Sequence, residues 1–222
     1  MTSNVRPDGG RSDSEFASAR NRMVDRLEQT GRITRSETAR AMRVVPRHEF
    51  IAPEKRSSAY ADRPLGIGAG QTISAPHMVA IMTDLLELSH GDRVLEIGTG
   101  CGYHAAVTAE IVGASNVYSV EYHESLAEKA QTALERSGYG GVQVRVGDGH
   151  EGWPTHAPYD RAYLTCAPAD LPDEVISQVS EGVVVGPVGH PRQELVRLRR
   201  SGGETTARET HGGVRFVTMK QR

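Results

Sequence analysis

The sequence predicts an α/β fold: a Rossmann-like, doubly wound sheet with a small N-terminal helical cap and a C-terminal antiparallel hairpin. The first supporting observation is an apolar, β-rich run over residues 93–97, which stops at glycines on alternate positions and leads into a helix-compatible run. The second is the pattern that follows, in which strand-like and helix-like segments alternate. Such alternation is typical of parallel sheets with helices on both faces.

The N-terminal part is expected to add the helical cap. Residues 1–13 have almost nothing to bury and are predicted to be a disordered tail, followed by a single domain over residues 14–222. A first helix is predicted with an inward face formed by Phe16, Met23, Val24 and Leu27. Thr34 and Glu37 have the spacing of a capping box, which predicts a second helix that ends before Pro46.

Residues 45–77 are rich in loop signals and are expected to form an ordered loop segment near the active site, since long irregular segments in compact domains are often functional. Residues 14–77 then comprise the cap and this segment, and residues 78–222 comprise the cofactor-binding core. Ser74 precedes Ala75 and Pro76 at the start of a strongly amphipathic run. From this local pattern alone, a helix N-cap is the favoured interpretation of Ser74.

The core is expected to alternate strands and helices. Strands are predicted over residues 116–121, 142–146, 161–165 and 183–185, and helices over residues 124–137 and 173–179. Residues 195–198 and 214–219, separated by a polar, turn-like segment, are predicted to form the closing hairpin. Ligands bind outside the carboxyl ends of strands in such sheets, so the residues that follow each strand are candidates for function.

Composition and charge narrow the functional classes. The 222 residues are 37% hydrophobic and 24% charged, and the net charge of -2 gives no sign of a nucleic-acid-binding surface. No apolar run approaches the roughly 20 residues that span a bilayer, and the polar start lacks the apolar region of a signal peptide. We therefore expect a cytoplasmic protein without a membrane partner. Cys101 and Cys166 fit neither a disulfide framework nor a metal-ligand spacing, so no metal is expected.

The glycine loop, with Gly98, Gly100 and Gly102, predicts a seat for a nucleoside-containing cofactor. Glycine lets the backbone approach a ligand closely, and the following helix N-terminus offers unpaired N–H groups. Residues 100–105 also fit the G-x-G-x-x-A form of the dinucleotide fingerprint. However, Glu96 stands two residues before Gly98, and this E-x-G-x-G-x-G string resembles motif I of class I S-adenosylmethionine-dependent methyltransferases.

Two more strand ends carry acidic residues suited to a nucleoside. Glu121 ends the second strand about 20 residues past the glycine loop, where a carboxylate can accept hydrogen bonds from a ribose diol. Asp148 is placed to accept from an adenine amino group, while the adjacent Gly149 lets the base lie close. Either residue alone is equally well explained as a helix cap or turn former. Together with Glu96 and the glycines they form a spaced set that predicts cofactor binding.

The fourth strand end, residues 164–168, lacks the Asn/Asp-Pro-Pro-aromatic string typical of enzymes that methylate exocyclic amines of nucleic-acid bases. Cys166 lies there without a Cys/His signature of nucleophilic catalysis around it. We interpret it as a small packing residue.

Seven blocks of sequence together resemble the protein-L-isoaspartate O-methyltransferases, over nearly the whole chain. These blocks are VPRHEFIAP, AYADRPLGIGAGQTISAPHMVAIM, VLEIGTGCGY, VYSVEY, VGDGHEGWP, APYD, and GPVG followed by QELV. The block GQTISAPH is the most diagnostic. The resemblance implies a Rossmann-like methyltransferase fold, with S-adenosyl-L-methionine as the methyl donor.

The resemblance also implies a substrate and its site. The expected reaction methylates the α-carboxylate of L-isoaspartyl residues, and less well D-aspartyl residues, in aged proteins and peptides, which initiates repair through a succinimide. By this resemblance Ile73 and Ser74 belong to the substrate and catalytic region, and we also expect Ala167 and Gly189 to bind the peptide. The protein partners are damaged proteins, with no nucleic acid, and a monomer is expected.

Departures from the family pattern leave two alternatives open. Residues 165–170 and 180–182 differ from the strings that the family carries beside the peptide site, and Arg192 stands where glycine is common. A class I methyltransferase for another carboxylate or a small molecule is the first alternative. A non-catalytic adaptor that binds isoaspartyl sites is the second, and the retained acidic residues and Ser74 argue against it.

Overall fold

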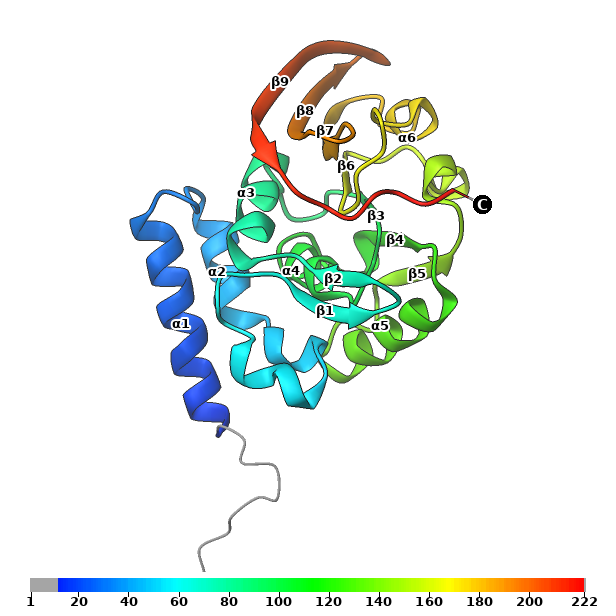
Figure 1. Ribbon diagram of the computed structural model, residues 1–222. Helices are drawn as coiled ribbons and strands as arrows, with labels where there is room; N and C mark the ends of the chain where they lie inside the picture. Colours follow the sequence, from blue (N-terminus) through cyan, green and yellow to red (C-terminus); the bar gives the residue numbers. More distant parts are fainter. Residues whose placement is uncertain (1–11, 222) are drawn as a thin grey trace, which may run out of the picture.

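The computed structural model describes residues 12–221, which form helices packed on both faces of one large sheet (Figure 1). The tail predicted for residues 1–13 lies outside the described residues except for Ser12 and Asp13. These two begin the first helix, where the Ser12 hydroxyl accepts from the backbone N–H of Glu15 and the Glu15 side chain accepts from the backbone N–H of Ser12. This reciprocal capping box starts the helix at Asp13.

Within residues 12–221 the main sheet has seven strands in the order β5-β4-β3-β6-β7-β8-β9. Strands β3 to β7 run parallel, and β8 and β9 add to β7 in antiparallel fashion. The strands are β3 (Val94–Ile97), β4 (Val117–Glu121), β5 (Gln143–Val146), β6 (Arg161–Leu164), β7 (Gly182–Val188), β8 (Gln193–Ser201) and β9 (Glu204–Val214). The sequence-predicted α/β sheet is confirmed.

The helices follow the sequence patterns closely. They are α1 (Asp13–Gln29), α2 (Ser36–Val44), α3 (Pro76–Leu86), α4 (Tyr103–Val112), α5 (Glu124–Arg136) and the short α6 (Asp173–Ser177). None in the described part of the chain combines the length and apolar character that crossing a membrane requires. The inward residues predicted for the first helix are all buried in α1.

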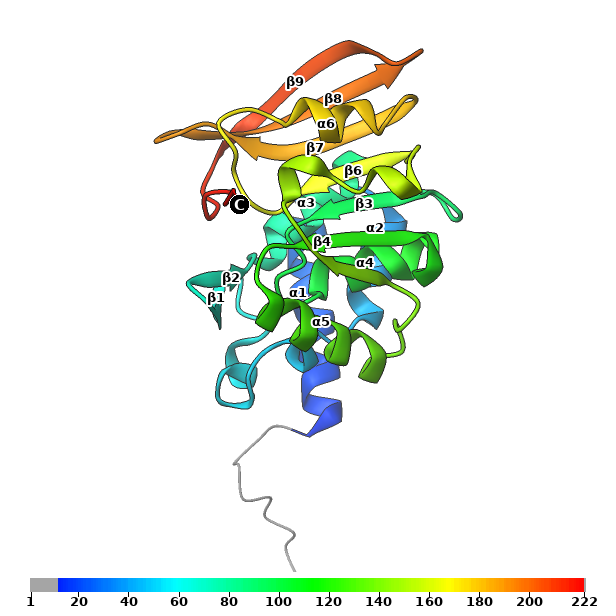
Figure 2. The same ribbon diagram turned by 90° about the vertical axis from the view of Figure 1, so that its right-hand side faces the viewer.

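Figure 2 shows the strands of the main sheet one above another. Alternation along β3 directs its side chains into two apolar layers, one on each face of this sheet. Val94 belongs to the layer under α3, α4 and α5, and Leu95 and Ile97 belong to the opposite layer, which α6 covers. Helix α2 packs on α3 and α4, and α1 packs on α2 and α3. The N-terminal cap, formed by α1 and α2, therefore packs mainly on helices α3 and α4. All four residues of β3 are buried.

The predicted closing hairpin needs a correction. Its second strand is the polar segment itself, β9, and the turn lies at Gly202 and Gly203, whose positive φ angles of 60° and 79° suit a two-residue hairpin turn. Strand β9 is an edge strand with mostly exposed side chains, so it does not need apolar alternation. Residues 215–221 instead cross back over the sheet, where Thr218 forms a parallel bridge with Ala167 (Figure 1).

The capping box predicted at Thr34 and Glu37 is wrong. Helix α2 begins at Ser36 without a side-chain cap. The N–H and the hydroxyl of Thr34 both donate to Asp84 Oδ2 of α3, at 2.6 and 2.8 Å. A distant carboxylate thus satisfies Thr34 in place of the local cap.

The loop segment also has more structure than its pattern indicates. It contains two 3-10 helices, η1 (Arg47–Phe50) and η2 (Pro53–Ser58), and a small antiparallel hairpin of β1 (Leu65–Gly68) and β2 (Gln71–Ile73). Strands of three or four residues are too short to give a clear periodicity. This hairpin leads directly into Ser74 and α3.

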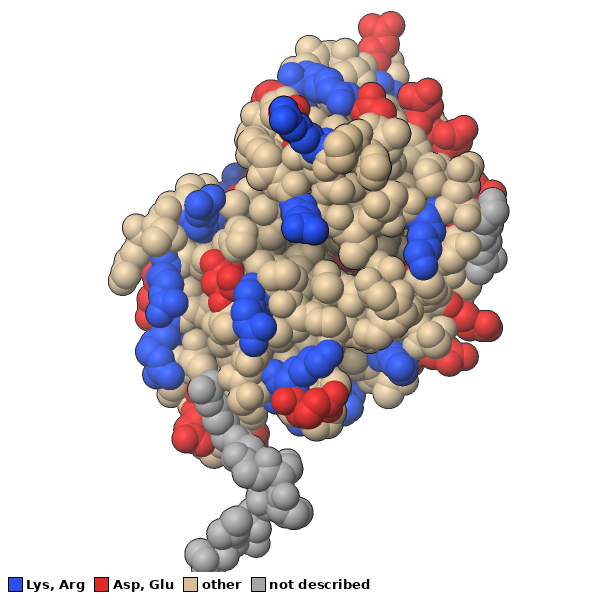
Figure 3. Space-filling model, viewed as in Figure 1, with Lys and Arg blue, Asp and Glu red and all other residues tan. Residues whose placement is uncertain are grey.

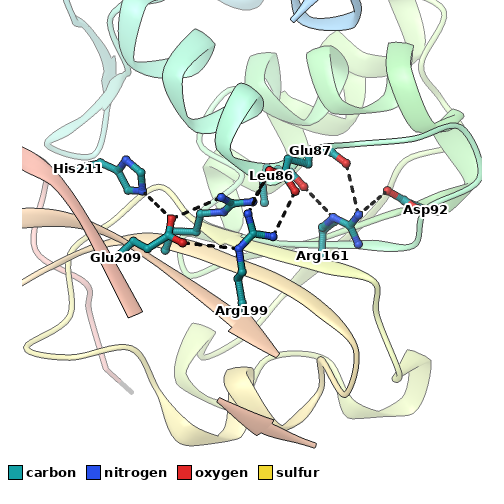
Figure 4. Close-up of polar contacts among 8 residues, drawn as sticks. Leu86, Glu87, Asp92, Arg161, Arg199, Glu209 and His211 are labelled. Carbon is teal, nitrogen blue, oxygen red and sulfur yellow. Dashed lines mark hydrogen bonds and ion pairs between the residues drawn. The ribbon is translucent and has the colours of Figure 1, made fainter. Parts of the chain in front are cut away.

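Charged side chains fasten the C-terminal end of α3 to the antiparallel strands (Figure 4). Glu87 lies 2.7 Å from Arg197 Nη2 and 3.3 Å from Arg199 Nη2, and both arginines also face Glu209 of β9. Arg161 donates from Nε to the carbonyl of Leu86 at 2.7 Å. Asp84 also accepts two hydrogen bonds from Thr34, so the C-terminal end of helix α3 is fixed to the N-terminal cap as well.

Candidate active site

An open cavity, about 770 Å³ with the solvent space at its mouth included, lies at the carboxyl ends of β3, β4 and β6. Four segments line most of it: residues 71–74, the loop 97–101, residues 120–123 and the C-terminal residues 217–220. Figure 3 shows the molecular face on which the surface is hollowed near its centre. The position matches the sequence prediction that residues just after the strands carry function.

The glycine loop has the backbone geometry that only glycine adopts without strain. Gly98, Gly100 and Gly102 have φ angles of 97°, 58° and 87°. A Cβ at Gly98 would lie 2.4 Å from Thr165 Oγ1, and the Thr165 hydroxyl donates to the Gly98 carbonyl at 2.5 Å. Gly98 and Gly100 line the cavity, whereas Gly102 caps α4 behind the loop, where Leu134 packs against it. The hydrogen bond from Thr165 therefore fixes the loop backbone beside the cavity.

Glu121 joins this loop to the end of β4. Its Oε2 accepts from the backbone N–H of Gly100 at 2.8 Å, and its Oε1 accepts from the N–H of His123 at 2.9 Å. The residue is 5% exposed and lines the cavity. A carboxylate has about four acceptor sites, so Glu121 can also accept hydrogen bonds from a ligand.

Glu96 lies deeper, with no exposed surface. Its Oε2 accepts from the Ser119 hydroxyl at 2.5 Å and its Oε1 from the Tyr163 hydroxyl at 2.9 Å. Burial raises the pKa of Glu96 to about 8, although both hydroxyls act in the opposite direction. Glu96 lines the cavity, and its two oxygens are already engaged within the protein.

Asp148 and Gly149 stand after β5. Asp148 Oδ1 accepts from the N–H of His150 at 3.0 Å and lies 2.9 Å from His150 Nδ1. Gly149 lines the cavity, and a Cβ there would lie 2.4 Å from Ile97 Cγ2 and 2.9 Å from Met219 Cε. Asp148 does not belong to the cavity lining. Because Gly149 has no side chain, Ile97 and Met219 can pack closely against it in this wall of the cavity.

Ser74 lines the cavity beside Ile73 and is not a helix cap. The N-cap of α3 is Ala75, and no side chain caps the helix. The Ser74 hydroxyl makes no hydrogen bond to any other residue among 12–221, and its carbonyl accepts from Arg47 Nη2 at 2.7 Å. The N-cap interpretation is wrong, and the hydroxyl is available to a ligand.

Ala167 and Gly189 are not brought into the cavity. The N–H of Ala167 donates to the Val217 carbonyl at 2.8 Å, and the N–H of Gly189 donates to the Pro168 carbonyl at 3.0 Å. Both donors proposed for a peptide are thus used inside the protein. The first of these N–H groups donates to Val217 in the segment 217–220. This segment was not predicted at the site, because residues 214–219 were assigned to the hairpin.

The C-terminal segment contributes a wall and a charge. Met219 packs near Gly149, and the Lys220 ammonium lies 3.2 Å from His123 Nε2. Because β9 ends at Val214, the residues that follow can cross the ends of the other strands. Assignment of residues 204–214 to an edge strand would have indicated from the sequence that this segment reaches the site.

His104 and two cysteines also face the cavity. The Thr83 hydroxyl donates to the Val79 carbonyl at 2.8 Å, so it accepts from His104 Nε2 at 3.1 Å. Burial lowers the pKa of His104 to about 3 and raises the pKa values of Cys101 and Cys166 to about 11 and about 12. Among residues 12–221, no group of histidine, cysteine and acidic side chains is arranged to hold a metal ion.

Comparison with known proteins gives consistent matches. Residues 18–222 match the family model described as Protein-L-isoaspartate(D-aspartate) O-methyltransferase. Protein-L-isoaspartate O-methyltransferase 2 of Archaeoglobus fulgidus is 48% identical, over 93% of this chain and 94% of the relative. Protein-L-isoaspartate O-methyltransferase of Methanopyrus kandleri is 46% identical, over 93% of each chain.

Solved structures agree. One protein-L-isoaspartate O-methyltransferase structure is 30% identical, with a TM-score of 0.83, over 91% of this chain and 66% of the solved one. A second, a putative member from Plasmodium falciparum in complex with S-adenosyl-L-homocysteine, is 21% identical, with a TM-score of 0.81, over 91% of this chain and 99% of the other. The second match shows the shared fold.

Proposed function

The chain belongs to the protein-L-isoaspartate(D-aspartate) O-methyltransferase family, and from this membership we propose how its own residues perform the family reaction. It is an enzyme that transfers a methyl group from S-adenosylmethionine to isoaspartyl residues of damaged proteins, the first step of their repair. The observation that carries the proposal is that the glycine loop, Glu121 and Ser74 line one cavity.

The cofactor half of the cavity fits a nucleoside. Glu121 is assigned to the ribose hydroxyls because it keeps acceptor capacity beyond its two backbone contacts. Gly98 and Gly100 let the ligand approach the loop backbone, and Gly149 lets Ile97 and Met219 pack closely in the wall assigned to the base. Asp148 lies outside the cavity lining but directly precedes Gly149, and it is assigned to the base as its hydrogen-bond acceptor. S-adenosylmethionine, when bound, supplies an electrophilic methyl group on a positively charged sulfur.

The substrate half is assigned to Ser74 and Ile73. An α-carboxylate has a reference pKa near 3.3–3.7, so it is ionised at neutral pH and needs no general base to attack. The Ser74 hydroxyl donates to one carboxylate oxygen and orients the other toward the methyl group. Ile73 is 4% exposed and excludes water beside it. Orientation of this kind can supply roughly 7–11 kcal/mol of the barrier.

The cavity walls support a reaction without a protein base. His104 has a pKa of about 3 with its Nε2 proton committed to Thr83, and the thiols of Cys101 and Cys166 stay protonated near neutral pH. A general base is most effective when its pKa lies near the working pH. None of these three groups meets that condition. The pKa of Glu96, about 8, lies closer to neutral pH, but both of its carboxyl oxygens are engaged by Ser119 and Tyr163.

One assay tests the function. Methyl transfer to an isoaspartyl peptide, measured as adenosylhomocysteine formed, should greatly exceed transfer to the normal aspartyl isomer. Equal rates would favour a methyltransferase for another carboxylate, and binding of the isoaspartyl peptide without transfer would favour the adaptor. We further propose a monomer in the cytoplasm, and light scattering on the purified protein tests the monomer.

Replacement of Glu121 by alanine should weaken S-adenosylmethionine binding by about 1–3 kcal/mol, because ribose hydroxyls lose a charged acceptor. Calorimetric titration measures the change. Glu124→Ala removes a nearby exposed carboxylate at the start of α5 and is the matched control. Equal affinities of the two variants would contradict the ribose assignment.

The chemical step should be nearly independent of pH between about pH 6 and 7.5, since neither reactant changes protonation there. Single-turnover formation of adenosylhomocysteine measures it without interference from ester hydrolysis. The window stops below pH 8 because Glu96 ionises near that value. A tenfold rise across the window, about 1.4 kcal/mol in barrier, would require a base and refute this mechanism.

A further inference from the structure

Arg47 is an entirely buried cation directly behind the cavity wall. It belongs to η1 and has no exposed surface. Its Nε donates to the Ala59 carbonyl at 2.8 Å and its Nη2 to the Ser74 carbonyl at 2.7 Å. Its guanidinium carbon lies 4.8 Å from the centre of the Tyr103 ring. Ser74 and Tyr103 both line the cavity.

The charge of Arg47 has no carboxylate partner among residues 12–221. Asp62, a carboxylate that acts on this charge electrostatically, instead accepts from the N–H of His77 at 2.9 Å and lies 2.8 Å from its Nδ1. The Nη1 atom of Arg47 is buried and has no hydrogen-bond partner within the described part of the chain. Arginine stays protonated at physiological pH, so this is an uncompensated positive charge.

The other deeply buried arginine shows the usual arrangement. Arg197 is 5% exposed, and Glu87 and Glu209 lie 2.7 and 3.5 Å from its guanidinium nitrogens. An unpaired charge inside a protein costs several kcal/mol of stability, so its presence calls for a compensating partner. Around Arg47 no such partner lies among the described residues, and two groups that its guanidinium contacts, Ser74 and Tyr103, line the cavity.

We propose that Arg47 is a positioning residue for Ser74 and the electrostatic complement of the isoaspartyl carboxylate that enters the cavity. The inference deepens the function proposed above and rests on it. Through Nη2 the guanidinium fixes the Ser74 carbonyl and with it the place of the hydroxyl. Through its unpaired charge it favours a carboxylate across a wall of low dielectric, where charges interact strongly.

The two roles separate kinetically. The carboxylate loses its negative charge as its oxygen bonds to the methyl carbon and the carbon–sulfur bond breaks. A fixed positive charge therefore favours the bound substrate more than the transition state, and its loss appears in the peptide KM. Loss of the Ser74 position instead appears in kcat.

The experiment compares Arg47→Lys and Arg47→Met in the full chain. Lysine keeps the charge but not the planar fork that bonds two carbonyls, so kcat should fall about tenfold or more with the peptide KM within about threefold of wild type. Methionine keeps length without charge, so the peptide KM should rise at least about tenfold as well. Arg197→Lys, a buried arginine away from the cavity, is the matched control and should change neither value.

A binding readout complements the kinetics. The peptide with an α-carboxamide in place of the reacting carboxylate is isosteric and uncharged. Wild type should bind the carboxylate peptide more tightly than the carboxamide, and Arg47→Met should lose that preference while keeping its affinity for S-adenosylhomocysteine. The loss of preference can be measured by inhibition and by titration even where turnover is small.

Three results would overturn the inference. They are an unchanged peptide KM in folded Arg47→Met, a retained carboxylate preference, or a tenfold loss of S-adenosylhomocysteine affinity with the peptide KM unchanged, which would assign the charge to the cofactor. If Arg47→Met does not fold, Arg47→Lys decides, because a KM rise with unchanged kcat contradicts both roles. Failure of the wild type to methylate the isoaspartyl peptide would instead refute the proposed function.

Discussion

Replacement of Ser74 by alanine is expected to lower kcat by about 10–150-fold, the loss of one hydrogen bond to a charged group at about 1.5–3 kcal/mol. The hydroxyl lines the cavity and has no partner within the described residues, while α3 is capped at Ala75 without any side chain. The melting temperature should therefore hardly change. Turnover with an isoaspartyl peptide and thermal unfolding, measured on the same sample, test both statements.

Ser12→Ala is the natural control because Ser12 is a genuine N-cap, which accepts from the N–H of Glu15 at 3.3 Å. It should lose about 1 kcal/mol of stability and keep its turnover. The reverse pattern, a destabilised Ser74→Ala with normal kcat, would show that Ser74 serves the fold. Only opposite responses of the two serines agree with the assigned roles.

The cofactor side of the site could be predicted from the sequence because its constraints are local. A buried strand, a turn with positive φ angles at Gly98, Gly100 and Gly102, and a following helix are all encoded within about ten residues. The carboxyl ends of β3 and β4 are adjacent in any parallel pairing of these strands, so Glu121 reaches Gly100 without further information.

The rest depends on contacts between distant segments. The polar β9 pairs as an edge strand because β8 offers a free edge, and no apolar pattern announces this. Because β9 occupies this edge, residues 217–220 lie at the cavity instead of in the hairpin. There the Val217 carbonyl accepts from the N–H of Ala167, which was expected to bind a peptide. The role of Arg47 could not be predicted for the same reason. Its partner Ser74 is 27 residues away, and nothing in the neighbouring sequence indicates that the Arg47 side chain is buried.

Replacement of Glu96 by glutamine should make the protein more stable than wild type at pH 8 and not at pH 4.5. Burial raises the pKa of Glu96 from 4.5 to about 8 in the folded state, so the unfolded chain loses this proton first as the pH rises. Wild type therefore has the full contribution of the neutral carboxyl below about pH 4.5 and loses it progressively up to about pH 8. Over that window the loss is on the order of 4 kcal/mol, at about 1.4 kcal/mol per pH unit.

Hydroxyl groups around Glu96 can accommodate its proton. Ser119 lies 2.6 Å from Thr99 Oγ1 and Tyr163 lies 3.1 Å from Thr108 Oγ1, so either hydroxyl can accept from the neutral carboxyl and donate onward. A glutamine amide fits the same pattern and carries no charge at any pH. The Glu96→Gln variant thus preserves the hydrogen bonds while it removes the titration.

Denaturant unfolding of the cofactor-free protein from pH 5 to 8 measures the difference in unfolding free energy between the variant and wild type. The expected result is a difference that grows in favour of Glu96→Gln by about 1.4 kcal/mol per unit until it levels near pH 8. Glu128→Gln, on the exposed side of α5, controls for the loss of one carboxylate and should follow wild type across the range. A constant difference for Glu96→Gln would mean that the folded protein holds Glu96 ionised throughout, with its charge stabilised by Ser119 and Tyr163 alone.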